Sequence, residues 1–322
     1  MIGIKGIASY FTGDKHSIQD LSEYGKLQDE EREYYNNVGI KTIYDADGCS
    51  AHDLALEASR VLLSRYNVAP ESIDAILLVK SRVPEHFVSS EATRLQQELG
   101  ALKALAFSVS DLGCVDSTLA LKIARDLMMA NPNYNRVLIA YGSKKFTPDR
   151  FRYPVTLTGD GGVACLIERT EENVIVDVEI ETNGAFWDLF KIEYQDRTFS
   201  EYREECRDVR AYGFELALES RNRFSNLNRR LLERNQLSQE DIKNVMMQNI
   251  SNRAFQYYED AFGFKLSPFC KMNLSQYGHL GSGDILLNYQ LGLQSKMIKP
   301  GDYSLILNNS PVAAWGSVLI KA

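Results

Sequence analysis

The chain has 322 residues, of which 44% are hydrophobic and 25% are charged, and its formal net charge at pH 7 is −7. This composition is typical of a globular protein with a large buried core, and the negative charge does not favour nucleic-acid binding, which needs clustered positive charge. The N-terminal residues lack the apolar core of a signal peptide, and no segment approaches the roughly 20 apolar residues of a membrane span. We therefore expect a cytoplasmic protein that binds neither nucleic acid nor a membrane.

In the first half of the chain, short apolar runs alternate with amphipathic segments. Gly100 ends a helix that begins at a serine, and the GDGG sequence at Gly159–Gly162 turns the chain into an apolar strand. The predicted helices are Ala51–Arg65, Ser89–Leu99 and about Asp116–Met129, and the predicted strands are Ile73–Val79, Ala104–Val109, Arg136–Tyr141 and Val163–Ile167.

The second half repeats this pattern. Its predicted helices are Phe214–Glu233, Arg253–Phe262 and Ser282–Leu293, and its predicted strands are Ile242–Met247, Tyr303–Leu307 and Ala314–Ile320. Strands that alternate with helices predict an α/β architecture, and the similar order suggests an internal duplication. We place an N-terminal half at residues 1–170, with Cys114, and a C-terminal half at residues 171–322, with Asn249 and His279.

The cysteines and histidines limit the chemistry that the chain can carry. Five cysteines stand at positions 49, 114, 165, 206 and 270, without a CxxC pair. This spacing is typical of neither a zinc site nor a disulfide framework, so we expect reduced thiols and no metal. Only four histidines, at positions 16, 52, 86 and 279, are available as acid–base groups.

Cys114 stands in the sequence LAFSVSDLGCVDSTLAL, between a predicted strand and the start of a predicted helix. The N-terminus of a helix carries free N–H groups and partial positive charge, which favour a thiolate and can hold a developing oxyanion. The position therefore suits a nucleophile that attacks a thioester carbonyl. The alternative is a small buried hydrophobic side chain, which is the commoner role of a free cysteine.

His279 lies in the glycine-rich sequence QYGHLGSGD, directly before a predicted helix. It could act as the base that a cysteine nucleophile needs, or it could be an ordinary loop residue. Asp284 follows five residues later, where it could orient the imidazole or only favour the helix N-terminus. His16 and His52 stand in polar stretches, and His86 is the remaining alternative beside a predicted strand.

Five sequence features, taken in order, resemble the β-ketoacyl-ACP synthase III family of the thiolase superfamily. They are Gly113–Cys114, GDGG at Gly159–Gly162, NISN at Asn249–Asn252, YGHLGS at Tyr277–Ser282 and AWGSVLI at Ala314–Ile320. The resemblance spans nearly the whole chain. It implies the five-layered αβαβα thiolase fold, two similar halves and a homodimer.

The resemblance also reveals an altered active site. The family's usual triad is Cys, His and Asn, whereas here Asn249 stands at the histidine position and His279 at the asparagine position. Some relatives in the superfamily use Cys, His and Asp to move an acyl group onto an oxygen or nitrogen nucleophile. By this resemblance Cys114 is the nucleophile, His279 the base and Asp284 its orienting group. Asn249 would donate its amide to the bound carbonyl or hold the acceptor.

The donor and oxyanion sites depart from the family as well. By count, Pro311 occupies the place of a glycine whose N–H completes the oxyanion hole, and proline has no N–H to donate. Either Val312 substitutes after a shift, or the hole relies on the Cys114 N–H and Asn249. Glu33 and Asn37 occupy the places of the residues that sandwich the CoA adenine.

No permanently bound cofactor is expected, and the donor is an acyl-CoA or an acyl carrier protein. Arg152 matches a phosphate-contacting arginine of the family, which makes it the candidate cofactor-binding residue. Acidic carrier proteins dock on basic patches. The candidate docking residues are Arg210, Arg221, Arg223 and Arg253, and the segments expected to line the site entrance are Val83–Ser90 and Gly184–Arg197.

These features predict an acyltransferase that moves an acyl group from a thioester through Cys114 to a second substrate, in secondary metabolism. One alternative is a decarboxylative synthase that forms a carbon–carbon bond. Another is a non-catalytic partner subunit of a ketosynthase heterodimer, which the retained Cys114 disfavours. The sequence leaves open the acyl chain, the acceptor and the choice between CoA and carrier protein.

Overall fold

The computed structural model describes residues 1–80 and 84–322. The predicted strands and helices are present, most of them within two or three residues of the expected bounds. Ser90 caps the helix that ends at Gly100, as the sequence indicates. The helices are α1 (Asp29–Asn37), α2 (Ala51–Arg65), α3 (Glu91–Leu99), α4 (Asp116–Ala130), α5 (Ala217–Arg234), α6 (Asn252–Phe262), α7 (Pro268–Tyr277) and α8 (Asp284–Gln294).

The strands include two long ones, β1 and β10, that the sequence pattern does not reveal. Consecutive side chains in the first parts of both strands are buried on both faces of the sheet, so their apolar residues do not follow a simple alternation. The strands of the main sheet are β1 (Ile2–Tyr10), β4 (Ala75–Val79), β5 (Leu105–Val109), β6 (Arg136–Ser143), β9 (Gly161–Arg169), β10 (Val174–Thr182), β13 (Ile242–Met247), β14 (Tyr303–Ser310) and β15 (Ala314–Lys321). The short pairs are β2 (Asp14–Ser17) with β3 (Thr42–Asp45), β7 (Phe151–Arg152) with β8 (Thr156–Leu157), and β11 (Phe190–Lys191) with β12 (Glu205–Cys206).

The nine long strands follow the order β13-β14-β15-β10-β1-β9-β6-β4-β5. On the N-terminal side, β4 pairs parallel to β6, β6 antiparallel to β9, and β9 antiparallel to β1. On the C-terminal side, β13 pairs parallel to β14, β14 antiparallel to β15, and β15 antiparallel to β10. The two halves therefore repeat one topology around the β1–β10 contact, and β5 is added at one edge.

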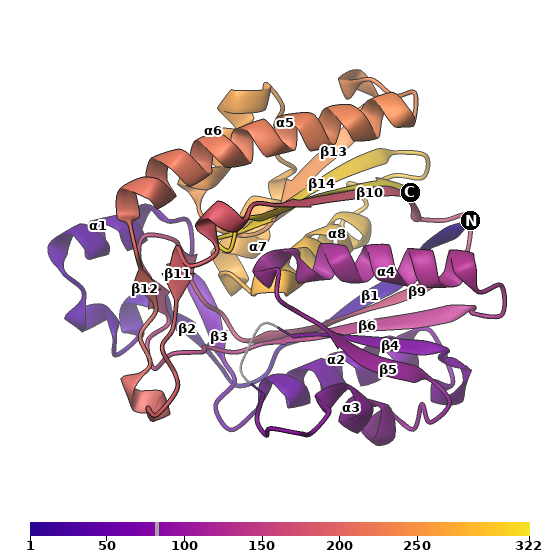
Figure 1. The fold of residues 1–322 in the computed structure, drawn as a ribbon, viewed down its shortest axis with the longest axis horizontal. Helices are drawn as coiled ribbons and strands as arrows, with labels where there is room; N and C mark the ends of the chain where they lie inside the picture. Colours follow the sequence, from indigo (N-terminus) through magenta and orange to yellow (C-terminus); the bar gives the residue numbers. More distant parts are fainter. Residues whose placement is uncertain (81–83) are drawn as a thin grey trace.

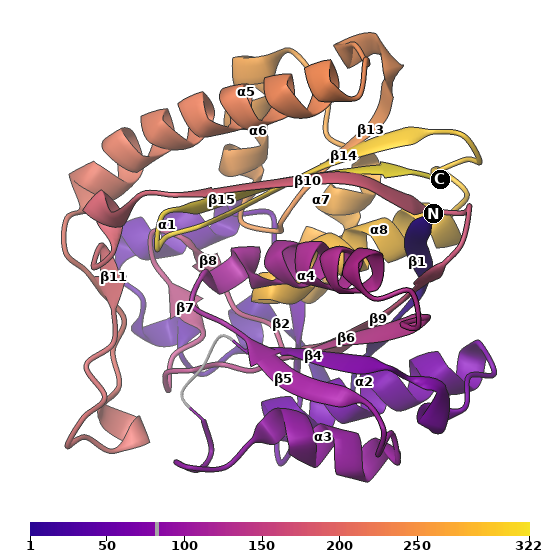
Figure 2. The same ribbon diagram turned by 45° about the vertical axis from the view of Figure 1, so that its right-hand side comes forward.

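The helices form three layers around the two parts of this sheet (Figure 1). Helices α2 and α3 cover the outer face of the N-terminal part, and α5 and α6 cover the outer face of the C-terminal part. Helices α4 and α8 lie between the two parts and contact strands of both (Figure 2). This is the five-layered αβαβα fold. No described helix is long and apolar enough to cross a membrane.

The GDGG segment does not form a simple turn, because β9 already begins at Gly161. Its glycines are needed for close packing: a Cβ at Gly162 would overlap the backbone oxygen of Leu54 in α2. Its aspartate, Asp160, is buried and accepts hydrogen bonds from Arg150 at 2.7 Å. Lys144 Nζ lies 2.8 Å from the same carboxylate, and Arg150 also contacts Asp45 at 2.6 Å. This buried ion cluster fixes the start of β9.

Candidate active site

Cys114 lies at the corner between β5 and α4, in a 3-10 turn formed by Gly113–Val115. Gly113 has φ +59°, the left-handed conformation that favours glycine, and this conformation directs the chain into the turn. Two side chains of the C-terminal half hold the corner in place. Ser282 Oγ donates to the Gly113 carbonyl at 2.8 Å, and Asn308 Nδ2 donates to the Cys114 carbonyl at 2.7 Å.

His279 stands on the C-terminal side of the same corner. Its ring Nε2 is 3.4 Å from Cys114 Sγ. The backbone at His279 is fixed by two hydrogen bonds: its N–H donates to the Leu157 carbonyl, and its carbonyl accepts from the Gly159 N–H. Gly278 precedes it at φ +67°, which places the end of α7 against β8. The sulfur and the imidazole therefore meet across the boundary between the two halves.

Asp284 is the first residue of α8. Together with Cys114 and His279 it forms a row of three hydrogen-bonded side chains, which we call the relay. Its Oδ2 is 2.6 Å from His279 Nδ1 and accepts the Asn249 N–H at 2.8 Å. Its Oδ1 accepts the Leu280 N–H at 2.8 Å. With the carboxylate fully buried and held by two backbone donors, Nδ1 of the ring must carry the proton. Nε2 is then the nitrogen that exchanges a proton at the sulfur.

The electrostatic balance at His279 favours its charged form. Burial opposes the charged imidazole, but the Asp284 carboxylate and the Cys114 sulfur outweigh burial and raise the pKa of His279 to about 10. A protonated imidazole beside a cysteine is the setting in which cysteines act as thiolate nucleophiles. The same imidazole can return its proton to a leaving group.

The structure places Asn249 outside the residues that line the cavities at Cys114, and its predicted role at the bound carbonyl or the acceptor stays a prediction. Its side chain is fully buried and points away from the cavities at Cys114, and its Oδ1 accepts from Asn288 Nδ2 at 3.0 Å. Gln248, one residue earlier, instead borders a small cavity together with Cys114 and His279. Adjacent residues at the end of a strand point to opposite sides. An alignment shifted by one residue therefore brings Gln248, and not Asn249, to the side of the strand that faces Cys114.

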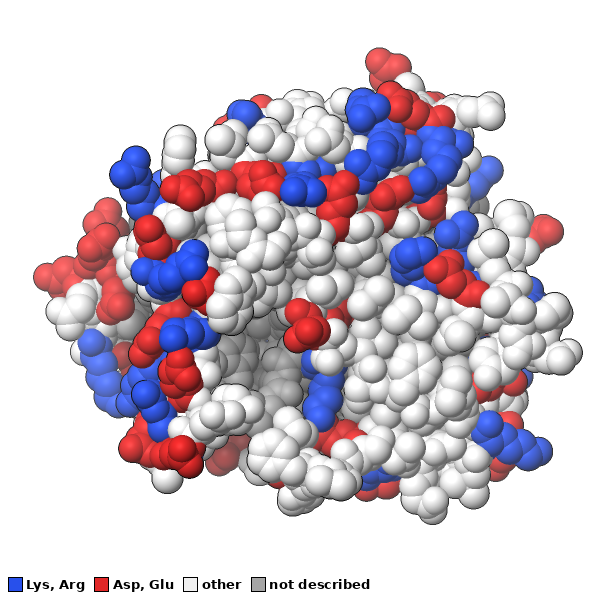
Figure 3. All heavy atoms as spheres, in the orientation of Figure 1, with Lys and Arg blue, Asp and Glu red and all other residues white. Residues whose placement is uncertain are grey.

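The large cavity beside Cys114 has a volume of about 410 Å³. Figure 3 shows a hollow on this side of the molecule. The predicted entrance segment 184–197 contributes through Phe190, Lys191, Ile192 and Tyr194, and Tyr141, Phe146, Phe199 and Tyr202 add further aromatic rings. Of the other predicted entrance segment, Val83 lies outside the described residues, and Glu85 borders a separate cavity beside Lys80.

Arg152 borders both cavities that meet at Cys114. Its guanidinium binds Glu204 through two hydrogen bonds, of 2.7 and 2.5 Å, and lies over the Phe146 ring. The sequence did not reveal Glu204, which is 52 residues away in an irregular segment. Because a carboxylate already occupies the guanidinium, Arg152 is part of the cavity wall, and its predicted contact with a donor phosphate stays a prediction.

A third cavity, of about 390 Å³, adjoins the small one on the side of α5 and α6. It shares Val155, Tyr212 and Ile250 with the small cavity, so it leads towards Cys114. Tyr34 borders it, whereas Glu33 and Asn37 of the same helix are exposed and do not. Arg253 stands at its rim.

Three of the four predicted docking arginines remain available on the surface. Arg210, Arg221 and Arg253 are exposed and make no ion pair with any described residue. Arg223 is instead engaged by Glu181 and Glu219.

Pro311 and Val312 both border the large cavity, and the donor of the oxyanion hole stays a prediction. Within the described residues, no group of three His, Cys, Asp or Glu side chains could hold a metal ion.

Comparison with known proteins identifies relatives of this fold and site. The 3-oxoacyl-[acyl-carrier-protein] synthase III model matches residues 110–184, and the C-terminal model of the same family matches residues 232–322, together just over half of the chain. A beta-ketoacyl-[acyl-carrier-protein] synthase III of Clostridium perfringens is 26% identical over 291 residues, which covers 89% of each chain.

Two solved structures illustrate the range of proteins with this fold. The 3-oxoacyl-(acyl carrier protein) synthase III of Pseudomonas aeruginosa superposes with a TM-score of 0.83 at 20% identity, covering 99% of this chain and 98% of the other. The acyltransferase ChlB3 superposes with a TM-score of 0.83 at 21% identity, covering 100% and 97%. The fold thus occurs both in a synthase and in an acyltransferase.

Proposed function

Since the chain belongs to the 3-oxoacyl-[acyl-carrier-protein] synthase III family, a thiolase-like family of transferases that act on acyl thioesters, we propose that it transfers an acyl group through Cys114 to an oxygen or nitrogen nucleophile. The observation that carries the proposal is the aligned Cys114–His279–Asp284 relay. It contains a nucleophile, a base and an orienting carboxylate at hydrogen-bonding distances.

The reaction follows in two steps. The Cys114 sulfur attacks the carbonyl carbon of the donor thioester, a carbon–sulfur bond forms, and the carrier thiol leaves with a proton from His279. The nucleophile of the second substrate then gives its proton to His279 Nε2 and attacks the acyl carbon. The bond to Cys114 breaks, and the sulfur is restored. Asp284 keeps the imidazole in one tautomer through both steps.

The cavities suggest how two substrates reach one sulfur. The cavity beside α5 and α6 would admit the donor arm, with its mouth at Arg253, and the large aromatic cavity would hold the acyl group or the acceptor. An acidic carrier protein is the favoured donor, because Arg210, Arg221 and Arg253 make no ion pair within the described part of the chain and Glu33 and Asn37 offer no stacking surface for adenine. A role in secondary metabolism would agree with such a carrier-bound donor.

The alternative, decarboxylative condensation, is favoured by the names of the curated relatives, which are synthases. That reaction needs hydrogen-bond donors at the thioester carbonyl to stabilise an enolate. Gln248 is a poor candidate, since its amide N–H groups are already donated to Asn309. The hypothesis of a non-catalytic partner subunit is disfavoured as well. Such a subunit would not need His279 and Asp284 hydrogen-bonded in line with a cysteine that borders a cavity.

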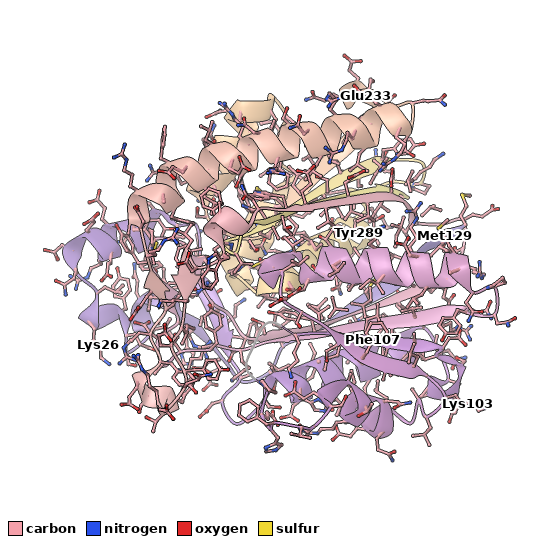
Figure 4. All side chains as sticks on the ribbon, in the orientation of Figure 1. Lys26, Lys103, Phe107, Met129, Glu233 and Tyr289 are labelled. Atoms are coloured by element: carbon pink, nitrogen blue, oxygen red, sulfur yellow. The ribbon has the colours of Figure 1, made fainter. Side chains whose placement is uncertain are left out.

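A homodimer built through β5 is part of the proposal. This strand lies at the edge of the sheet, and Leu105 is 50% exposed there. Figure 3 shows a broad area with few charged side chains over β5, beside the exposed Lys122 and Asp126 of α4, and Figure 4 places Phe107 and Met129 on this side. An open apolar edge strand is a template for pairing with a second copy. Leu105→Lys should convert a dimer to a monomer in sedimentation analysis, while Met297→Lys, at another exposed apolar residue, should not.

Intact mass spectrometry after incubation with a panel of acyl-CoA and acyl-carrier thioesters tests the function. We expect one acyl adduct on the wild type and none on Cys114→Ala. Cys49→Ala is the matched control, because Cys49 is also half-buried but borders none of the cavities at Cys114. No adduct with any donor, or an adduct that persists in Cys114→Ala, would reject the proposal.

A further inference from the structure

The small cavity between Cys114, His279 and Gln248 has a volume of about 40 Å³, enough for one small polar group. Two side-chain atoms of its lining residues are buried and lack a hydrogen-bond partner among the described residues: Gln248 Oε1 and Ser310 Oγ. An unpartnered buried acceptor costs free energy of folding. Two of them around one cavity beside the nucleophile indicate a site built for a polar ligand group.

The orientation of the Gln248 amide is fixed by its partner. Its Nε2 lies 2.7 Å from the backbone carbonyl of Asn309 and also contacts Asn309 Oδ1. A carbonyl oxygen can only accept, so the nitrogen of Gln248 must face Asn309, and both its hydrogens are used there. The atom of the Gln248 amide that is left without a partner among the described residues is therefore an oxygen, which accepts a hydrogen bond and cannot donate one.

An acceptor at this position restricts the second substrate. The nucleophile must give one hydrogen to His279 Nε2, and a second hydrogen is needed to satisfy Gln248 Oε1. A hydroxyl group carries only one hydrogen, whereas a primary amine carries two. Building on the proposed function, we propose that the acyl acceptor is a primary amine, held by Gln248 Oε1 beside the acylated Cys114, and that the product is an amide.

The transfer balances as an aminolysis of the thioester. The amine nitrogen forms a bond to the acyl carbon, and the bond from that carbon to Cys114 Sγ breaks. His279 accepts one amine proton and passes it to the departing sulfur. The second N–H stays on the nitrogen, hydrogen-bonded to Gln248, and becomes the N–H of the amide. Gln248 thus orients the acceptor, because its Oε1 accepts a hydrogen bond from the amine.

The test compares two probes that differ only in the nucleophile, glycinamide and glycolamide. Cys114 is first loaded with an acyl group, excess donor is removed, and the loss of the adduct is followed by intact mass spectrometry. We expect glycinamide to discharge the acyl-enzyme faster than glycolamide, by a ratio that combines the greater nucleophilicity of an amine with about tenfold from one hydrogen bond made in the transition state. The product should be N-acylglycinamide.

Two variants separate this role from a structural one. Gln248→Met keeps the shape but removes the acceptor, so loading of Cys114 should be retained while the ratio of the glycinamide rate to the glycolamide rate falls about tenfold. Gln290→Met is the matched control, because Gln290 Oε1 is also buried and unpartnered but borders none of the cavities at Cys114. It should keep the preference.

The outcomes distinguish this inference from the proposed function. A loaded enzyme that glycolamide or water discharges as fast as glycinamide would overturn the amine acceptor and leave acyl transfer through Cys114 intact. A ratio of the glycinamide rate to the glycolamide rate that is unchanged in Gln248→Met would overturn the role of Gln248. A wild type that never loads would overturn both.

Discussion

Two buried carboxylates, Asp160 and Asp284, show how similar surroundings serve different ends. Each is almost completely buried and each holds a cationic partner within 2.7 Å. Asp160 faces Arg150 and Lys144, which stay charged, and these cations keep the pKa of Asp160 below its ordinary value despite its burial. Asp284 faces His279, which can release its proton at the Cys114 sulfur.

The difference lies in the partner and in access, not in burial. The Asp160 cluster fixes the start of β9 and borders neither cavity at Cys114, whereas the Asp284 relay ends at a half-buried sulfur beside both of them. A buried charge therefore indicates a catalytic function only where its partner can exchange a proton with a substrate that enters an adjacent cavity. The two clusters can be broken separately, which makes each a control for the other.

Asp284→Asn should give the largest effect. Losing the carboxylate removes the charge that stabilises the imidazolium and allows the wrong tautomer, so we expect the transfer rate to fall by about 10³- to 10⁴-fold. Steady-state kinetics with the best donor of the panel measures this rate. A fall of less than tenfold in a folded variant would mean that His279 acts without Asp284.

Asp160→Asn should act on stability instead. Removing the carboxylate leaves the buried Arg150 and the partly buried Lys144 with too little negative charge, which we expect to lower the free energy of unfolding by about 3–5 kcal/mol. Chemical denaturation measures the loss. The rate per folded molecule should stay close to that of the wild type, and a large fall in that rate would show that the cluster also shapes the catalytic site.

The pH dependence of stability should separate the two clusters further. The pKa of His279 is raised from 6.5 to about 10 in the folded protein. A raised folded-state pKa contributes stability that is fully present below about pH 6.5 and is lost as the pH rises through about 10. Denaturation curves of the wild type should weaken over this range more steeply than those of His279→Gln. Parallel curves would contradict a protonated His279.

Arg253→Glu should have the smallest effect, because Arg253 has no internal partner in the described part of the chain. The substitution should raise the KM for a carrier-protein thioester several-fold and leave kcat unchanged, as expected for an exposed charge that steers an acidic partner. Arg229→Glu, at an exposed residue of α5 away from the cavity, is the control. Equal effects of both variants would remove Arg253 from the docking surface.

The sequence predicted that Cys114, His279 and Asp284 lie together, as they do in the structure, but it did not predict their surroundings. Cys114, His279 and Asp284 stand in motifs whose local turns place them, so their meeting follows from the order of the motifs. Asn249 and Gln248 differ by one position at the end of β13, and only the packing of that strand determines which one faces the cavity. The Arg152–Glu204 pair joins the two-residue strand β7 to an irregular segment, and no periodic pattern could have revealed it.

The reaction of the isolated acyl-enzyme tests the central claim most directly. Wild-type protein loaded at Cys114 is divided between a panel of amines and alcohols and a malonyl-carrier thioester, and the products are identified by mass. The account predicts an acylated amine or alcohol, no release of CO₂, and restoration of unmodified Cys114. Discharge by the malonyl thioester alone, with release of CO₂ and a β-ketoacyl product, would contradict it.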